Sequence, residues 1–99
     1  EIRVLIITGG TGLSLRDQTV DVLARIEDRE LPGFGELFRG LSYEEIGPRA
    51  MLSRAKASLV EDTLVFSLPG SPAAVRLGLE KLVLPVMGHA IYEIDKEDG

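Results

Sequence analysis

Two apolar runs in this chain are each followed at once by a glycine-containing turn and then by a helical pattern. The first run begins at Ile2 and leads into TGGTG, and the second, TLVFSL, leads into PGSP. Uninterrupted rather than alternating apolarity is typical of strands buried on both faces, as in parallel sheets covered by helices. The pattern predicts an α/β fold in three layers with a mainly parallel sheet, in which Arg3–Thr8 and Thr63–Leu68 are adjacent strands. It also allows an α+β domain with an antiparallel pair.

The segments between and after these units predict shorter elements. Proline and glycine between 31 and 35 break one helical pattern, and Pro85 interrupts another. A short strand at Leu59-Val60 can pair in a hairpin across Glu61-Asp62, and the polar tail 95–99 is expected to fray. The predicted helical segments cover residues 20–26, 36–41, 51–57, 72–84 and 86–94.

Length and charge exclude several classes of protein. Ninety-nine residues with 11 Lys+Arg and 16 Asp+Glu give one acidic domain with a net charge of −5. Nucleic-acid binding needs a basic face, and a membrane-spanning helix needs about 20 apolar residues in a row. The absence of cysteine excludes disulfides and thiolate chemistry. We expect a soluble cytoplasmic protein that binds neither nucleic acid nor membrane.

The beginning of the chain predicts a partial domain. The apolar run starts directly after Glu1, although a strand buried in the middle of a sheet needs a neighbour on both sides. A chain of this size also buries little surface by itself. We therefore expect residues 1–99 to form a single, N-terminally truncated domain that is stabilised by self-association.

The two glycine loops are the first candidate binding site. If their strands are parallel, both loops open at the carboxyl edge of the sheet, where α/β folds bind ligands. Glycine lets the backbone approach a ligand closely, and helix N-termini direct free N–H groups at anions. The loops can form a phosphate or pyrophosphate cradle, or they can be tight turns only. Neither a Walker A motif nor GxGxxG is present.

Single residues near these loops add candidate chemistry. The Asp17 carboxylate can hold Mg²⁺ between phosphates or orient a nucleophile, or it can act as the N-cap of the next helix. Ser53 and Arg54 can donate hydrogen bonds to a phosphate, or they can belong to an exposed helical turn. His89 is the single histidine, so we expect a partly buried structural role rather than a metal site.

Five motifs follow one another along the chain: TGGTGLSLRDQT (8–19), ELPGFGELFR (30–39), AMLSRAKA (50–57), LVFSLPGSPAAVRLGLEKL (64–82) and LPVMGHAIYEI (84–94). In this order they resemble the MoaB/MogA family, the molybdopterin adenylyltransferases of molybdenum cofactor biosynthesis, whose relatives include the G domain of gephyrin. The resemblance covers nearly the whole chain, and the ordered set is more specific than a single glycine loop.

The resemblance implies transfer of AMP from Mg-ATP to molybdopterin with release of pyrophosphate, in a homotrimer. It assigns catalytic roles to Asp17 and Ser53, and it makes Asp17 the residue that holds Mg²⁺. Substrate binding is implied for the two loops, namely Thr8, Gly9, Gly10, Thr11 and Gly12 in the first and Pro69, Gly70, Ser71 and Pro72 in the second.

This sequence departs from the family pattern at several positions. The family usually has proline at Leu15 and Val20, glycine near Ser58, and often alanine at Gly78. A family domain is about one and a half times as long, and its first part carries a further acidic residue in a VPD-type motif. Two other functions remain open: a non-catalytic pterin-binding or scaffolding module, and a CinA-type nucleotide hydrolase of the same superfamily.

Overall fold

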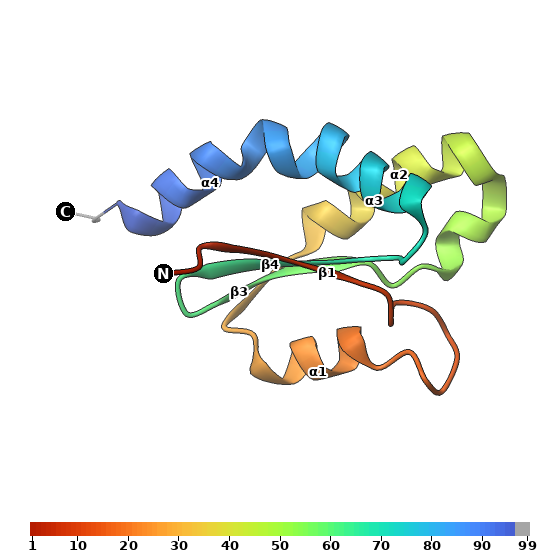
Figure 1. The fold of residues 1–99 in the computed structure, drawn as a ribbon, viewed down its shortest axis with the longest axis horizontal. Helices are drawn as coiled ribbons and strands as arrows, with labels where there is room; N and C mark the ends of the chain where they lie inside the picture. Colours follow the sequence, from red (N-terminus) through yellow and green to blue (C-terminus); the bar gives the residue numbers. More distant parts are fainter. Residues whose placement is uncertain (97–99) are drawn as a thin grey trace.

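A four-stranded sheet forms the middle layer of the molecule (Figure 1). Helix α1 (Thr19–Ile26) covers one face, and α2 (Pro32–Ile46), α3 (Pro72–Gly78) and α4 (Leu84–Asp95) cover the other. The computed structural model describes residues 1–96. The three-layer α/β fold is confirmed. The sheet order is β1-β4-β3-β2, with bounds Val4–Thr8 for β1, Thr63–Leu68 for β4, Lys56–Val60 for β3 and Arg29–Leu31 for β2.

The two strands that precede the glycine loops are neighbours and run parallel, as predicted. Ile6 of β1 lies opposite Phe66 of β4. The other two pairs are antiparallel, so the sheet is mixed rather than mainly parallel. The reason is local: the predicted hairpin places Val60 opposite Thr63 across the two-residue turn Glu61-Asp62, which fixes β3 antiparallel to β4.

The predicted helix at 51–57 is wrong. A 3₁₀ helix, η1 (Gly47–Leu52), ends at Leu52, and β3 begins at Lys56. Alanine and lysine favour helix locally, but here Ala57 pairs with Phe66 in the sheet and is fully buried. Tertiary pairing therefore overrides the local preference.

The first predicted helix does end before residues 31–35, but these residues do not all lie outside helices, because Pro32 starts the longest described helix. The helix α2 (Pro32–Ile46) has proline in its first turn, where no intrahelical N–H is needed. A Cβ at Gly35 would lie 2.7 Å from the carbonyl oxygen of Ala55. Glycine at this position lets α2 pack directly against the chain that leads into β3.

The C-terminal helical segments follow one another without an intervening loop. They are α3 (Pro72–Gly78), a π-helical turn η2 (Leu79–Val83) and α4 (Leu84–Asp95). Pro85 lies in the first turn of α4 and does not break the path, because the preceding turn has π rather than α spacing. Asp95 still belongs to α4, so the tail prediction is wrong there; residues 97–99 lie outside the described residues.

The core lies between the sheet and the layer formed by α2, α3 and α4. Phe34 and Phe38 of α2 are both buried, and the rings of Phe34 and Phe66 meet edge to face with centroids 5.1 Å apart. Val83 of η2 closes this cluster. On the opposite face, α1 (Thr19–Ile26) buries Leu23 alone among its residues. The two glycine loops therefore rest on a strand pair that is well packed on one side.

Candidate functional site

The two glycine loops meet at the carboxyl ends of β1 and β4, as the sequence predicts. The backbone N–H of Gly9 donates to the carbonyl oxygen of Leu68 at 2.8 Å. A Cβ at Gly70 would lie 3.6 Å from the Cα of Gly9. Parallel strands place both loops at one edge, and this contact brings the two backbones side by side.

The first loop needs glycine at Gly10 for two reasons. Gly9 and Gly10 have φ values of +93° and +76°, a region that favours glycine. A Cβ at Gly10 would also lie 2.0 Å from the side-chain oxygen of Thr19. The loop thus turns back against the first residue of α1, and a larger residue at Gly10 has no room.

The Asp17 side chain belongs to the loop and does not cap α1. Its Oδ2 accepts the backbone N–H of Ser14 at 3.0 Å. Gln18 occupies the N-cap position, and no side chain caps this helix. The cap interpretation is therefore wrong. The carboxylate is half-buried and fixed beside Gly12, where a Cβ would lie 2.9 Å from Oδ2.

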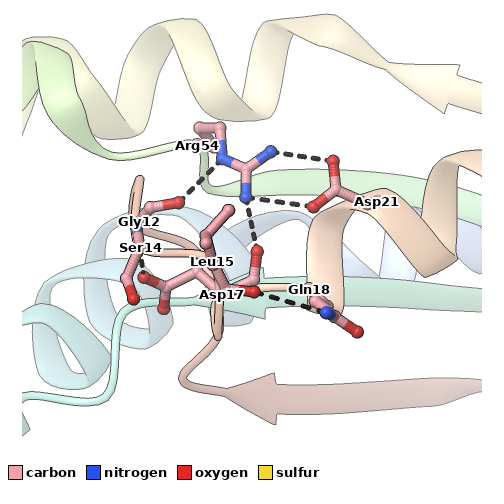
Figure 2. Close-up of polar contacts among 7 residues, drawn as sticks. All are labelled: Gly12, Ser14, Leu15, Asp17, Gln18, Asp21 and Arg54. Carbon is pink, nitrogen blue, oxygen red and sulfur yellow. Dashed lines mark hydrogen bonds and ion pairs between the residues drawn. The ribbon is translucent and has the colours of Figure 1, made fainter.

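The Arg54 guanidinium donates hydrogen bonds to the backbone of this loop (Figure 2). Its Nε donates to the carbonyl oxygen of Gly12 at 2.9 Å, and Nη2 donates to that of Asp17 at 2.7 Å. The Asp21 carboxylate accepts from Nη1 at 2.9 Å and from Nη2 at 3.1 Å. Arg54 lies beyond the end of η1, so its interpretation as part of an exposed helical turn is wrong. Donation to a phosphate stays a prediction, and in this structure the guanidinium is engaged by protein acceptors.

Asp21 is the site residue that the sequence reasoning missed. Its hydrogen bonds from Arg54 lower the pKa of its carboxyl below the ordinary value, and the same bonds raise the pKa of Arg54. A weak signal was present: Asp21 is the acidic residue in the first turn of the helix that follows the loop.

Ser53 directly precedes Arg54 and lies in extended backbone immediately after η1. Its Oγ accepts the backbone N–H of Ala55 at 3.2 Å, which leaves the hydroxyl proton to donate elsewhere. Its carbonyl oxygen accepts from Arg39 Nη1 at 3.3 Å. Ser53 also borders a hollow of about 330 Å³ that is lined by Arg39 and Lys56.

The remaining predicted loop residues differ in their exposure and in their hydrogen bonds. Thr8 is exposed at the end of β1, whereas Thr11 is buried and its carbonyl oxygen accepts the Arg54 backbone N–H at 2.8 Å. In the second loop, Ser71 Oγ caps α3 by accepting from Ala74 N at 3.2 Å. Pro72 is the first residue of α3, as predicted, and Gly70, which follows Pro69, lies beside Gly9.

Two hollows of different character border α1. One of about 570 Å³ is polar, lies beside Asp17 and is lined by Ser14, Asp21 and Arg54. The other, of about 680 Å³, is apolar and lies between β1 and α1. A phosphate ligand requires polar partners, so the first hollow is the one that suits the predicted chemistry.

Three further expectations concern histidine, metal and membrane. The His89 side chain is 72% exposed on α4 and lies 3.6 Å from Glu93, so the prediction of partial burial is wrong. Across residues 1–96, no cluster of three or more His, Cys, Asp or Glu side chains could hold a metal. No helix in this part of the chain is long and apolar enough to cross a membrane.

Comparison with known proteins gives a consistent result. Residues 1–89 match the family described as "Probable molybdopterin binding domain". Molybdenum cofactor biosynthesis protein B of Staphylococcus aureus (strain MRSA252) is 52% identical over 97 residues, which is 97% of this chain and 58% of that protein. The chain thus spans less than two thirds of this relative's length.

Solved structures of similar proteins share the fold. A crystal structure of molybdenum cofactor biosynthesis protein B aligns with a TM-score of 0.91 at 47% identity, covering 96% of this chain and 60% of that one. The tungsten cofactor synthesizing protein MoaB from Pyrococcus furiosus aligns with a TM-score of 0.87 at 40% identity, covering 94% and 59%. On these matches, and on the two loops that carry its motifs, the chain belongs to the MoaB/MogA family of molybdopterin-binding domains.

Proposed function

We propose that this chain binds molybdopterin at the two glycine loops and acts in molybdenum cofactor biosynthesis by transferring AMP from Mg-ATP. In this reaction a phosphate oxygen of molybdopterin bonds to the α-phosphorus of ATP. The bond from that phosphorus to the bridging oxygen breaks, and pyrophosphate leaves. The observation that carries the proposal is the convergence of both loops with the Asp17 carboxylate held between Gly12 and Ser14.

The roles of the loops follow from their backbone. Gly10 and Gly70 have no side chain of their own to shield their peptide N–H groups from a ligand, whereas the N–H of Gly9 already donates to the carbonyl oxygen of Leu68. Such N–H groups can neutralise phosphate charge in a protein that is acidic overall. Nucleotidyl transfer mainly needs in-line positioning and charge stabilisation, which fixed backbone donors supply.

Asp17 is the residue that would hold Mg²⁺. One carboxylate suits an Mg²⁺ that takes its remaining ligands from phosphates and water, whereas a resident site needs more protein ligands than residues 1–96 offer here. Bound there, the ion supplies charge neutralisation at the phosphates. Ser53 would donate its free hydroxyl proton to a phosphate oxygen.

Self-association into a homotrimer is part of the proposal. Among the described residues β1 has a partner on one side only, and Leu5 of this strand is 41% exposed. Ile2, Val22 and Ile26 are exposed around the same apolar hollow. Exposed strand edges and apolar patches of this kind favour association. Sedimentation at micromolar concentration tests it, and a stable monomer would contradict it.

The test of function is binding followed by turnover. We expect the chain to bind molybdopterin in calorimetry and to convert Mg-ATP to pyrophosphate in its presence. Binding without turnover would support the non-catalytic pterin-binding alternative instead. Absence of binding would overturn the proposal. A cytoplasmic location belongs to the same proposal, because the reaction consumes ATP.

A further inference from the structure

We propose that Arg54, oriented by Asp21, is a positioning residue that fixes the shape of the ligand loop from Gly12 to Asp17. The claim that Arg54 shapes the loop depends only on the contacts of Arg54. The claim that Arg54 affects the reaction rests on the proposed function, because Arg54 acts through the Asp17 carboxylate and the loop backbone.

The loop has little regular structure to hold it. Between Thr8 at the end of β1 and Thr19 at the start of α1, no residue belongs to a helix or strand. The hydrogen bonds within it are short-range: Asp17 N donates to Ser14 O at 2.9 Å, and Gln18 Nε2 donates to Leu15 O at 3.3 Å. These bonds define a local turn and leave its position relative to the sheet unfixed.

Arg54 fixes the position of this turn relative to the sheet. It binds the loop at both ends of the turn, through the carbonyl oxygens of Gly12 and Asp17. Its own backbone N–H also donates to Thr11 O at 2.8 Å. Arg54 directly precedes Ala55 at the entrance to β3, so these contacts tie the loop to the rigid sheet. They also fix the distance of the loop from the neighbouring Ser53.

Asp21 makes this arrangement specific to arginine. Its two carboxylate oxygens take the Nη1 and Nη2 edge of the guanidinium, while Nε and the second Nη2 proton reach the two loop carbonyls (Figure 2). A planar guanidinium can serve these acceptors together, and a lysine ammonium cannot match the geometry. Arg54→Lys therefore keeps the charge and loses the positioning.

A second arginine provides a matched control. Arg3 donates to both oxygens of Asp95, at 2.6 and 3.1 Å, and its Nε donates to the Asp62 carbonyl oxygen at 3.0 Å. This cluster has the same chemistry as the Arg54 cluster, but it joins the hairpin turn to the end of α4, away from the ligand loops. Arg3→Lys measures what loss of such a cluster does without touching the loop.

The experiment compares Arg54→Lys, Asp21→Asn and Arg3→Lys by amide hydrogen exchange and by titration with Mg-ATP and with pyrophosphate. In Arg54→Lys we expect the Ser14 and Asp17 amides to exchange about tenfold faster, since charge-assisted hydrogen bonds are lost, with Phe66 unchanged. Asp21→Asn should do the same to a smaller extent. Arg3→Lys should leave the loop amides unchanged.

The rate measurement separates positioning from general destabilisation. With the fold intact, Arg54→Lys should lower kcat by about 100-fold while changing KM little, because a misplaced reacting group costs about that much. In Arg54→Ala, added guanidinium ion should restore loop protection and turnover. Loop exchange like that of the wild type, or loop exchange raised equally by Arg3→Lys, would overturn the proposal. If the wild type binds no pterin or nucleotide, the proposed function fails, while the exchange data still decide the role of Arg54.

Discussion

The Asp17 carboxylate accepts the backbone N–H of Ser14 at 3.0 Å, three residues back in the same loop. This bond uses Oδ2 and points the side chain into the loop instead of toward the N-terminus of α1. An asparagine oxygen can accept the same hydrogen bond, so the charge of Asp17 and its structural role can be separated by a single substitution.

Asp17→Asn should leave the fold intact and lower AMP transfer by a factor of about 100, as expected for the loss of one electrostatic stabiliser. Molybdopterin binding should be less affected than turnover. Thermal stability, pterin affinity and the rate of AMP transfer are measured for this chain and for a full-length relative, each with and without the substitution. Asp28→Asn is the matched control, because Asp28 Oδ2 accepts the Glu61 backbone N–H at 2.6 Å, away from the loops. Unchanged transfer in Asp17→Asn would reduce Asp17 to a structural residue.

Glu27→Gln should destabilise the fold by about 1–3 kcal/mol, because it leaves the buried Lys56 ammonium with only the more distant Glu30 carboxylate, at 3.9 Å. Lys56 is 8% exposed, its Nζ lies 2.8 Å from Glu27 Oε1, and Ser58 Oγ donates to the same oxygen. Urea unfolding measures the loss. The control is Glu93→Gln, which removes a half-exposed carboxylate paired with exposed Lys96. Equal effects of both substitutions would contradict the prediction.

The same cluster predicts a pH dependence. Hydrogen bonds from Lys56 and Ser58 lower the pKa of Glu27 below its ordinary value of 4.5. Because the folded pKa is below the unfolded one, the stabilisation is complete above about pH 4.5 and is lost as the pH falls through the folded pKa. Glu27→Gln should therefore flatten the acid limb of the stability curve. If the acid limb of the Glu27→Gln variant is identical to that of the wild type, the loss of stability at low pH comes from other carboxylates.

Gly40→Ala and Gly78→Ala should have opposite effects although both glycines are helical. A Cβ at Gly40 meets nothing within 4 Å, so alanine should stabilise α2 by about 1 kcal/mol. At Gly78 a Cβ would lie 2.7 Å from Leu68 Cδ2 in the core, and overpacking should cost about 1–3 kcal/mol. Thermal melts of both variants check this, and stabilisation by Gly78→Ala would show that Leu68 moves freely.

Glu61→Gly should stabilise the hairpin between β3 and β4. Glu61 has a φ of +55° at the first position of a two-residue turn, where glycine is preferred and other residues are strained by about 1–2 kcal/mol. Its backbone N–H bond to Asp28 is retained. A higher melting temperature is expected, and Asp62→Gly, which relieves no such strain, should lower it. A lower melting temperature for Glu61→Gly would contradict the prediction.

Local sequence predicted the functional end of the molecule better than the rest of the fold. Uninterrupted apolar runs identified β1 and β4, and glycines at 9, 10 and 70 marked the two loops that meet beyond them. These features depend on burial and on backbone freedom, which the residue types state directly. Parts of β3 and α2 were predicted, at 59–60 and 36–41, but their starts at Lys56 and Pro32 were missed, because pairing with β4 and packing against Ala55 decided them.

The sequence by itself determined the family, the strand–loop–helix units and the position of Asp17 beside the glycines, since all of these depend on short stretches of chain. The tertiary structure decided what Asp17 and Arg54 do there. Whether Asp17 caps a helix or lies in the loop depends on where α1 begins, and Gln18 takes the cap position. The Arg54 guanidinium donates hydrogen bonds to residues that lie between 33 and 42 positions earlier in the chain. Such contacts exist only once β3 has paired with β4, because that pairing places Arg54 over the loop.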